Sequence, residues 1–129
     1  MKILIADDHA GMRSMLRSLI SLALQDAAEI VECESGEQAV AMAASERPDC
    51  VLMDLELGQM SGFEAAMNGF DAARQILRQE APAAIWMVTS YDSPAFRARA
   101  AQLGIEQFIC KENLSELTPL LQTLTHPKL

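Results

Sequence analysis

Basic residues are scarce in this 129-residue sequence, and it contains no long hydrophobic run. Ten Lys and Arg stand against 18 Asp and Glu, which gives a formal net charge of −8 at pH 7. Such a surface repels nucleic-acid phosphates and anionic lipid headgroups, so we expect no direct nucleic-acid binding. The first apolar run ends at Asp7 and Asp8, far short of a signal-peptide core or a membrane span. We therefore expect a cytoplasmic protein without membrane contact.

Cysteine is also sparse. Cys33, Cys50 and Cys110 lie in or beside apolar runs, and they form neither a CxxC pair nor a zinc-site spacing. Free cysteine is usually buried, so we interpret all three as reduced core residues. Half of the residues are hydrophobic and 22% are charged, which is typical of a folded globular protein. The length suits one domain, residues 1–129.

Short apolar runs alternate with longer segments of helical period. This alternation is typical of parallel strands joined by crossover helices. It predicts an α/β three-layer sandwich in which each of five strands is followed by a helix. The expected strands cover residues 2–6, 28–33, 49–53, 84–88 and 105–110.

Several helix boundaries have recognisable signals. Ser35 with Gln38 fits a capping box, and Asn113 with Glu116 fits another. Pro at position 94 and Gly at position 104 suit the first turn and the left-handed end of a helix. The last helix presents a leucine stripe, which predicts a face that packs on the sheet. Its members are Leu114, Leu117, Leu120, Leu121 and Leu124.

A short internal repeat follows the third predicted strand. Residues 60–66 (MSGFEAA) are followed at once by residues 67–73 (MNGFDAA). Seven residues make nearly two helical turns, so both copies keep their apolar residues on one helical face. We therefore predict a third helix extended by about 10 Å, with Gly69 inside it at a cost of about 1 kcal/mol.

Reactive side chains follow four of the five predicted strands. In an open parallel sheet the carboxyl ends of the strands meet at a crevice where the strand order reverses. We therefore expect an acidic pocket with one cation. Its members are Asp7, Asp8, Asp54, Thr89 and Lys111.

This pocket suits phosphoryl transfer. Carboxylates that converge repel one another unless a hard cation compensates them, and Mg²⁺ prefers such oxygen ligands. The Asp54 carboxylate can then attack phosphorus in line and form an acyl phosphate. Lys111 and Thr89 would contact the phosphoryl oxygens.

Each of these residues also has an ordinary explanation. Asp7 and Asp8 could cap a helix, and Lys111 could be a solvated surface charge. Their conjunction at successive strand ends favours the chemical interpretation. His9 is interpreted as a loop or first-turn residue.

The pattern resembles the response-regulator receiver domain, the phosphoacceptor half of bacterial two-component signalling. The resemblance covers nearly the whole chain. It rests on residues 3–8 (ILIADD), 48–55 (PDCVLMDL), 60–62 (MSG), 87–90 (MVTS) and 103–111 (LGIEQFICK).

The resemblance implies a flavodoxin-like fold with strand order 2-1-3-4-5. It implies that Asp54 is the phosphorylation site and, with Asp7 and Asp8, a magnesium ligand. The backbone carbonyl of Glu56 would be a further ligand.

The resemblance also implies a switch formed by Thr89 and Phe108. The hydroxyl would move to the phosphoryl group and the ring would turn inward, remodelling the face made by the fourth helix, fifth strand and fifth helix. A downstream protein would bind that face, and a phosphorylation-dependent homodimer is another implied outcome. The phosphoryl donor would be a sensor histidine kinase or a phosphotransfer protein.

The sequence departs from the family at several positions near the pocket. Gly58 and Glu112 stand where the family usually has proline, which predicts looser loops. Glu56 and Tyr91 lie two residues past Asp54 and Thr89, where their side chains should obstruct an attacking water. We therefore expect slow self-dephosphorylation.

Two other functions remain open. The first is a pseudo-receiver, an unphosphorylated docking or oligomerisation module. The second is an aspartyl-phosphate phosphatase, which would need an aspartate as general acid where this chain has Glu56. Apart from its own phosphoryl transfer and dephosphorylation, we expect no enzyme activity.

Overall fold

The five apolar runs form one parallel sheet. The computed structural model describes residues 1–57, 68–80 and 82–125. The strand order is β2-β1-β3-β4-β5, and all four neighbouring pairs are parallel, as predicted. The strands are β1 (Lys2–Ala6), β2 (Glu29–Cys33), β3 (Cys50–Met53), β4 (Ala84–Thr89) and β5 (Gln107–Cys110).

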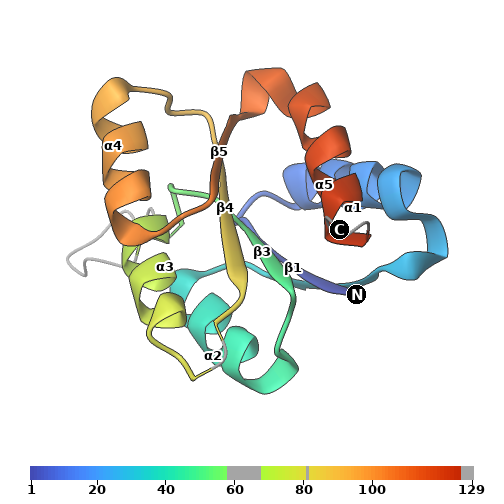
Figure 1. Cartoon of the computed structure of the whole chain (residues 1–129), viewed down its shortest axis with the longest axis horizontal. Helices are drawn as coiled ribbons and strands as arrows, with labels where there is room; N and C mark the ends of the chain where they lie inside the picture. Colours follow the sequence, from blue (N-terminus) through green and yellow to red (C-terminus); the bar gives the residue numbers. More distant parts are fainter. Residues whose placement is uncertain (58–67, 81, 126–129) are drawn as a thin grey trace.

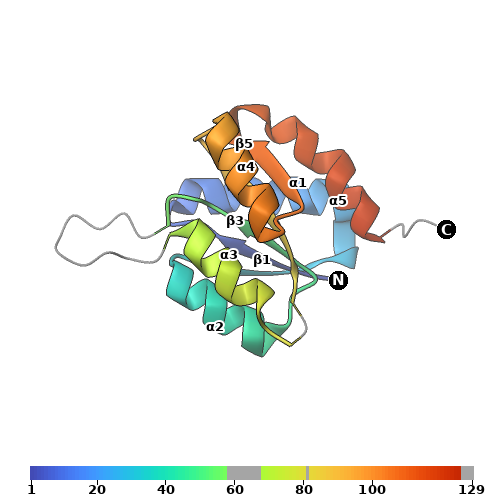
Figure 2. The same ribbon diagram turned by 60° about the vertical axis from the view of Figure 1, so that its left-hand side comes forward.

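Five α-helices cover the two faces of this sheet (Figure 1). They are α1 (Ala10–Leu24), α2 (Gly36–Glu46), α3 (Gly69–Leu77), α4 (Pro94–Leu103) and α5 (Leu117–Thr125). Two short 3₁₀ segments are also present: η1 (Gln25–Ala27) precedes β2, and η2 (Lys111–Glu116) precedes α5. One face carries α1 and α5, and the other carries α2, α3 and α4 (Figures 1 and 2). The predicted three-layer sandwich is confirmed.

The strands β1, β3 and β4 are buried and apolar along most of their length because helices cover both faces of the sheet, whereas the edge strand β2 also carries Glu29 and Glu32. In β1, Ile3 and Ile5 pack beneath α1 and α5, whereas Leu4 and Ala6 pack on the other side. The three cysteines are buried with free thiols, as expected. Burial raises the pKa of the Cys33 thiol to about 11, which keeps it protonated.

The predicted extension of the third helix is wrong. Asn68 has an extended backbone (φ −84°, ψ 178°), and α3 begins at Gly69. The Asn68 side chain accepts a hydrogen bond from the Asp71 amide, and the Asp71 carboxylate accepts one from the Asn68 amide. This capping box fixes the point at which the helix begins. Gly69 is thus the first helical residue, while residues 58–67, with Gly58 and the first repeat copy, lie outside the described residues.

The last helix starts later than its sequence signal suggests. Asn113 is non-helical (φ −124°, ψ 43°) within η2, and α5 begins at Leu117. The leucine stripe is confirmed, because Leu117 and Leu121 are buried and the other three leucines pack around them. Among the described residues, none of the helices combines the length and the apolar character needed to cross a membrane.

Candidate functional site

Acidic side chains from two neighbouring strands meet at the carboxyl edge of the sheet. Asp7 follows β1 and Asp54 follows β3, and these carboxylates are 1% and 2% exposed. The Asp54 amide donates to the Ala6 carbonyl, which extends the strand pairing to the first residue of the loop. Asp8 and His9 follow Asp7, and one potential ligand atom from each of the four residues lies within 4.8 Å of the others.

The sequence pattern did not predict that His9 belongs to this cluster. It occupies the N-cap position of α1, close to its expected location. Its Nδ1 atom lies 2.8 Å from Asp8 Oδ1 and 3.4 Å from Asp7 Oδ1. The available signal was its position directly after two acids at a strand end.

Lys111 reaches the acidic cluster from the end of β5. Its Nζ atom lies 3.0 Å from Asp7 Oδ2 and 3.2 Å from Asp54 Oδ2. The lysine side chain is only 11% exposed, so solvent screens these ion pairs weakly. The sequence prediction that a cation faces the carboxylates is confirmed.

The charges of this pocket are strongly coupled. Burial, followed by the nearby Asp7 charge, raises the pKa of Asp54, although Lys111 and the Glu56 amide partly oppose the shift. The Glu56 amide donates to Asp54 Oδ1 over 3.2 Å. Burial alone would lower the pKa of Lys111, but its contacts with Asp7 and Asp54 outweigh burial and raise it. One lysine thus only partly neutralises the two buried carboxylates.

The residues present fit a divalent cation. Asp7 Oδ2 is buried and, within the described part of the chain, accepts no hydrogen bond of suitable geometry, although Lys111 lies 3.0 Å away as an ion-pair partner. A buried oxygen with spare lone pairs next to two further carboxylates is a donor set that Mg²⁺ accepts.

The predicted switch residues lie on β4 and β5, the two strands that follow β3 in the sheet. Thr89 is fully buried at the end of β4, and its hydroxyl accepts a hydrogen bond from the Tyr91 amide over 3.2 Å. Among the described residues no hydrogen bond joins Thr89 to Asp54. Phe108 is partly buried in β5, and the guanidinium carbon of Arg97 lies 4.8 Å from the centre of its ring. Tyr91 is 50% exposed.

The sequence of residues 3–122 matches the protein-family model of the response regulator receiver domain. The chain belongs to this family. The pocket of Asp7, Asp8 and Asp54 in this receiver domain is typical of a phosphoacceptor. A receiver domain is a signalling module.

Relatives and a solved structure agree with this assignment. The receiver domain is 32% identical over 116 residues to the transcriptional regulatory protein YdfI of Bacillus subtilis, covering 89% of this chain and 50% of YdfI. It is 32% identical over 110 residues to the chemotaxis protein CheY of Thermotoga maritima, covering 85% and 84% of the two chains. The chain therefore spans about half the length of the first-named relative and most of CheY.

The fold also matches the receiver domain of the sensor histidine kinase PA1611 from Pseudomonas aeruginosa, with a TM-score of 0.76 and 24% identity. The match covers 94% of this chain and 93% of that one. In that structure a magnesium ion is coordinated in the active site cleft.

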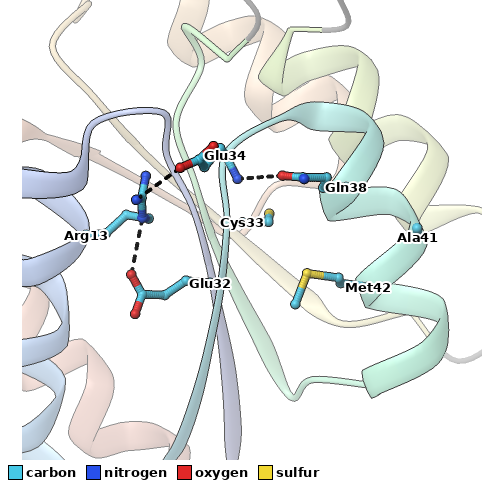
Figure 3. A pocket seen from close by; sticks show the side chains of 7 residues that line it. All are labelled: Arg13, Glu32, Cys33, Glu34, Gln38, Ala41 and Met42. Atoms are coloured by element: carbon cyan, nitrogen blue, oxygen red, sulfur yellow. Dashed lines mark hydrogen bonds and ion pairs between the residues drawn. The ribbon is translucent and has the colours of Figure 1, made fainter.

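Arg13 links the acidic cluster of this receiver domain to its edge strand. One guanidinium nitrogen donates to the Asp7 carbonyl over 2.8 Å, while others contact Glu32 at 3.2 Å and Glu34 at 3.3 Å. Figure 3 shows this arginine among the side chains that line an open pocket of about 530 Å³, whose other lining residues come from the end of β2 and from α2. The acids that line this pocket are paired with Arg13, and it includes no residue of the acidic cluster.

Proposed function

We propose that residues 1–129 form a receiver domain that accepts a phosphoryl group on Asp54 from a phosphohistidine. The donor would be a sensor histidine kinase, or a phosphotransfer protein, in the cytoplasm. The single observation that carries this proposal is the position of Asp54, buried at the end of β3 with Lys111 3.2 Å from Oδ2 and Asp7 beside it.

The transfer exchanges one bond to phosphorus for another. A carboxylate oxygen of Asp54 forms a bond to phosphorus as the bond from phosphorus to the donor imidazole nitrogen breaks, and that nitrogen keeps the electron pair. The Lys111 ammonium pairs with the carboxylate before the transfer, and it can pair with a negatively charged phosphoryl oxygen after it. Burial of Asp54 limits access of bulk water to the acyl phosphate that results.

Asp7, Asp8 and Asp54 would hold Mg²⁺, with the backbone carbonyl of Glu56 as a further ligand. When bound, the cation offsets the negative charge of the carboxylates and of the incoming phosphoryl oxygens. The buried Asp7 Oδ2, which among the described residues has an ion pair with Lys111 but accepts no hydrogen bond of suitable geometry, supports this assignment. The magnesium ion in the PA1611 receiver domain supports it by analogy.

Thr89 and Phe108 would transmit the phosphorylation of Asp54 to the protein surface. The Thr89 hydroxyl would leave the Tyr91 amide and donate to a phosphoryl oxygen, and the Phe108 ring would turn inward. This would change the face made by α4, β5 and α5, to which a downstream protein or a second copy of the chain would bind.

The test is incubation with acetyl phosphate and Mg²⁺, followed by intact-mass measurement. We expect one base-labile phosphoryl adduct in the wild type and none in Asp54→Asn. Asp49→Asn is the matched control, because Asp49 is an exposed aspartate at the opposite end of the same strand. That variant should retain the adduct.

Other outcomes separate the alternatives. An adduct that survives in Asp54→Asn would place the acceptor elsewhere. A folded wild type that takes up no phosphoryl group would favour the pseudo-receiver. Continuous release of inorganic phosphate from a simple phosphomonoester would favour the phosphatase.

A further inference from the structure

Arg97 of α4 makes three contacts that converge from different elements. Its guanidinium donates to both carboxylate oxygens of Asp92, over 2.6 and 3.1 Å. The same group lies over the ring of Phe108, 4.8 Å from its centre, and points one nitrogen at the Phe108 carbonyl at 3.5 Å. Arg97 therefore ties the loop after β4 to β5, and Figures 1 and 2 both show α4 beside that strand.

Asp92 belongs to the same loop that is hydrogen-bonded to Thr89. The Tyr91 amide donates to the Thr89 hydroxyl over 3.2 Å, and Asp92 is the next residue. A continuous series of contacts thus runs from Thr89 through this loop to Arg97 and then to Phe108. The hydroxyl cannot turn toward Asp54 without losing its bond to the Tyr91 amide, so such a turn would disturb the loop that anchors Arg97.

Phe108 has no hydroxyl with which to fix its own position. Its ring packs partly against the core and partly against Arg97. A planar guanidinium that is held by a carboxylate at two points can present its face to an aromatic ring. Among the described residues, Arg97 is thus a polar group placed to hold this ring.

We propose that Arg97 is a positioning residue that holds Phe108 in its present place until Thr89 turns toward a phosphoryl group, when Asp92 releases it. This inference rests on the proposed function, because the phosphoryl group on Asp54 is what draws Thr89 away. The arginine acts through Phe108 and touches none of the reacting atoms.

An ordinary surface ion pair is the alternative. Arg97 and Asp92 are 48% and 38% exposed, and exposed pairs of this kind contribute little to stability. Such a pair would have no effect on the phosphoryl site. The contact with Phe108 separates the two explanations. If Arg97 is a positioning residue, a change in this ion pair affects Phe108 in β5, whereas a simple surface ion pair has no such effect.

The first measurement is the affinity for beryllofluoride, a phosphoryl mimic, in the presence of Mg²⁺. Removing the contact destabilises the conformation that competes with binding, so Arg97→Met should lower the apparent Kd about two- to fivefold. Asp92→Asn should have a similar effect, and the double variant should add little to either. Arg99→Met is the matched control, because Arg99 is an exposed arginine of α4 with no ion pair to any described residue. It should leave the Kd unchanged.

The second measurement needs no phosphoryl group. Aromatic relaxation dispersion of Phe108 reports the population of its minor ring position on the microsecond to millisecond scale. This population should rise about two- to fivefold in Arg97→Met and Asp92→Asn, and it should stay unchanged in Arg99→Met.

The outcomes separate this inference from the proposed function. If the wild type binds beryllofluoride but Arg97→Met changes neither the Kd nor the Phe108 population, the positioning role is overturned and the phosphoacceptor stands. Effects of Arg97→Met and Asp92→Asn that add fully would overturn the coupling through Asp92. If the wild type binds no mimic and accepts no phosphoryl group, the proposed function fails, together with the release step that depends on it. The Phe108 population would then decide whether Arg97 still holds the ring.

Discussion

Gly69 lies directly against the backbone of Asp54. A Cβ atom built on Gly69 would overlap the Asp54 carbonyl oxygen and would lie 2.8 Å from the Cα atom of Leu55. The Gly69 amide also donates to the Leu55 carbonyl over 3.0 Å. The first residue of α3 therefore supports the loop that presents the phosphoacceptor, and only glycine allows so close an approach.

This contact predicts that Gly69→Ala destabilises the protein. The new methyl group would meet backbone atoms, which cannot move aside as a flexible side chain can, so we expect a loss of about 1 to 3 kcal/mol in the free energy of unfolding. Urea denaturation measures it. Gly11→Ala is the control, because a Cβ there meets nothing within 4 Å and should stabilise α1 by up to about 1 kcal/mol. Equal effects of the two substitutions would contradict the steric explanation.

The start of α3 shows what sequence periodicity can and cannot predict. A seven-residue repeat keeps its apolar face whether the helix runs through both copies or begins at the second, so periodicity alone could not place the boundary. The Asn68 and Asp71 capping signal was present in the sequence. The deciding constraint, the close approach of Gly69 to Asp54, is a contact across 15 positions that no local pattern reveals.

The pocket itself was largely predictable. Parallel strands deliver their carboxyl ends to one edge, so the order of apolar runs was enough to bring Asp7, Asp54 and Lys111 together. Arg13 and Arg97 could not be found in this way. Each acts from a helix through long side-chain contacts, and their spacing to those partners follows no repeating pattern.

The raised pKa of Asp54 predicts that the site is a source of instability. Between the ordinary carboxyl pKa and the raised one, the folded state holds a proton that the unfolded state has lost, so stability falls as the pH rises through this window. At neutral pH, Asp54→Asn should therefore stabilise the metal-free protein by about 1 kcal/mol.

Urea denaturation across acidic pH values tests this prediction. The gain from Asp54→Asn should shrink as the pH falls through the raised pKa, since the wild-type carboxylate then becomes neutral as well. Asp49→Asn is again the control, and it should show no gain at neutral pH. A loss of stability in Asp54→Asn at pH 7 would mean that the Lys111 ion pair outweighs burial and the repulsion from Asp7.

The position of His9 predicts an effect on metal preference. Imidazole nitrogen suits Ni²⁺ and Zn²⁺, whereas Mg²⁺ prefers oxygen ligands. His9→Asn should therefore weaken Ni²⁺ binding by about tenfold, or about 1.4 kcal/mol, and leave Mg²⁺ binding nearly unchanged. Titration calorimetry measures both. A parallel loss for the two ions would indicate that His9 acts on Asp8 rather than on the metal.

Glu56 and Tyr91 predict how long a phosphoryl group persists on Asp54. Their amides make matching contacts, since the Glu56 amide donates to Asp54 Oδ1 and the Tyr91 amide to the Thr89 hydroxyl, each over 3.2 Å. Both side chains therefore begin next to the groups that would surround the phosphoryl oxygens. The Tyr91 ring also packs edge-on against Phe96, with ring centres 6.4 Å apart, which limits its movement.

Replacing both residues by alanine removes bulk and one negative charge from the path of an attacking water. We expect the phosphoryl half-life to shorten by about tenfold, equivalent to about 1.4 kcal/mol in the barrier. Loss of the adduct after removal of acetyl phosphate, followed by mass, gives the rate. Glu56→Gln keeps the bulk without the charge and Tyr91→Phe keeps the ring, so these two variants show which property matters. A half-life unchanged in the double alanine variant would show that neither side chain obstructs water, and that burial of Asp54 alone sets the rate.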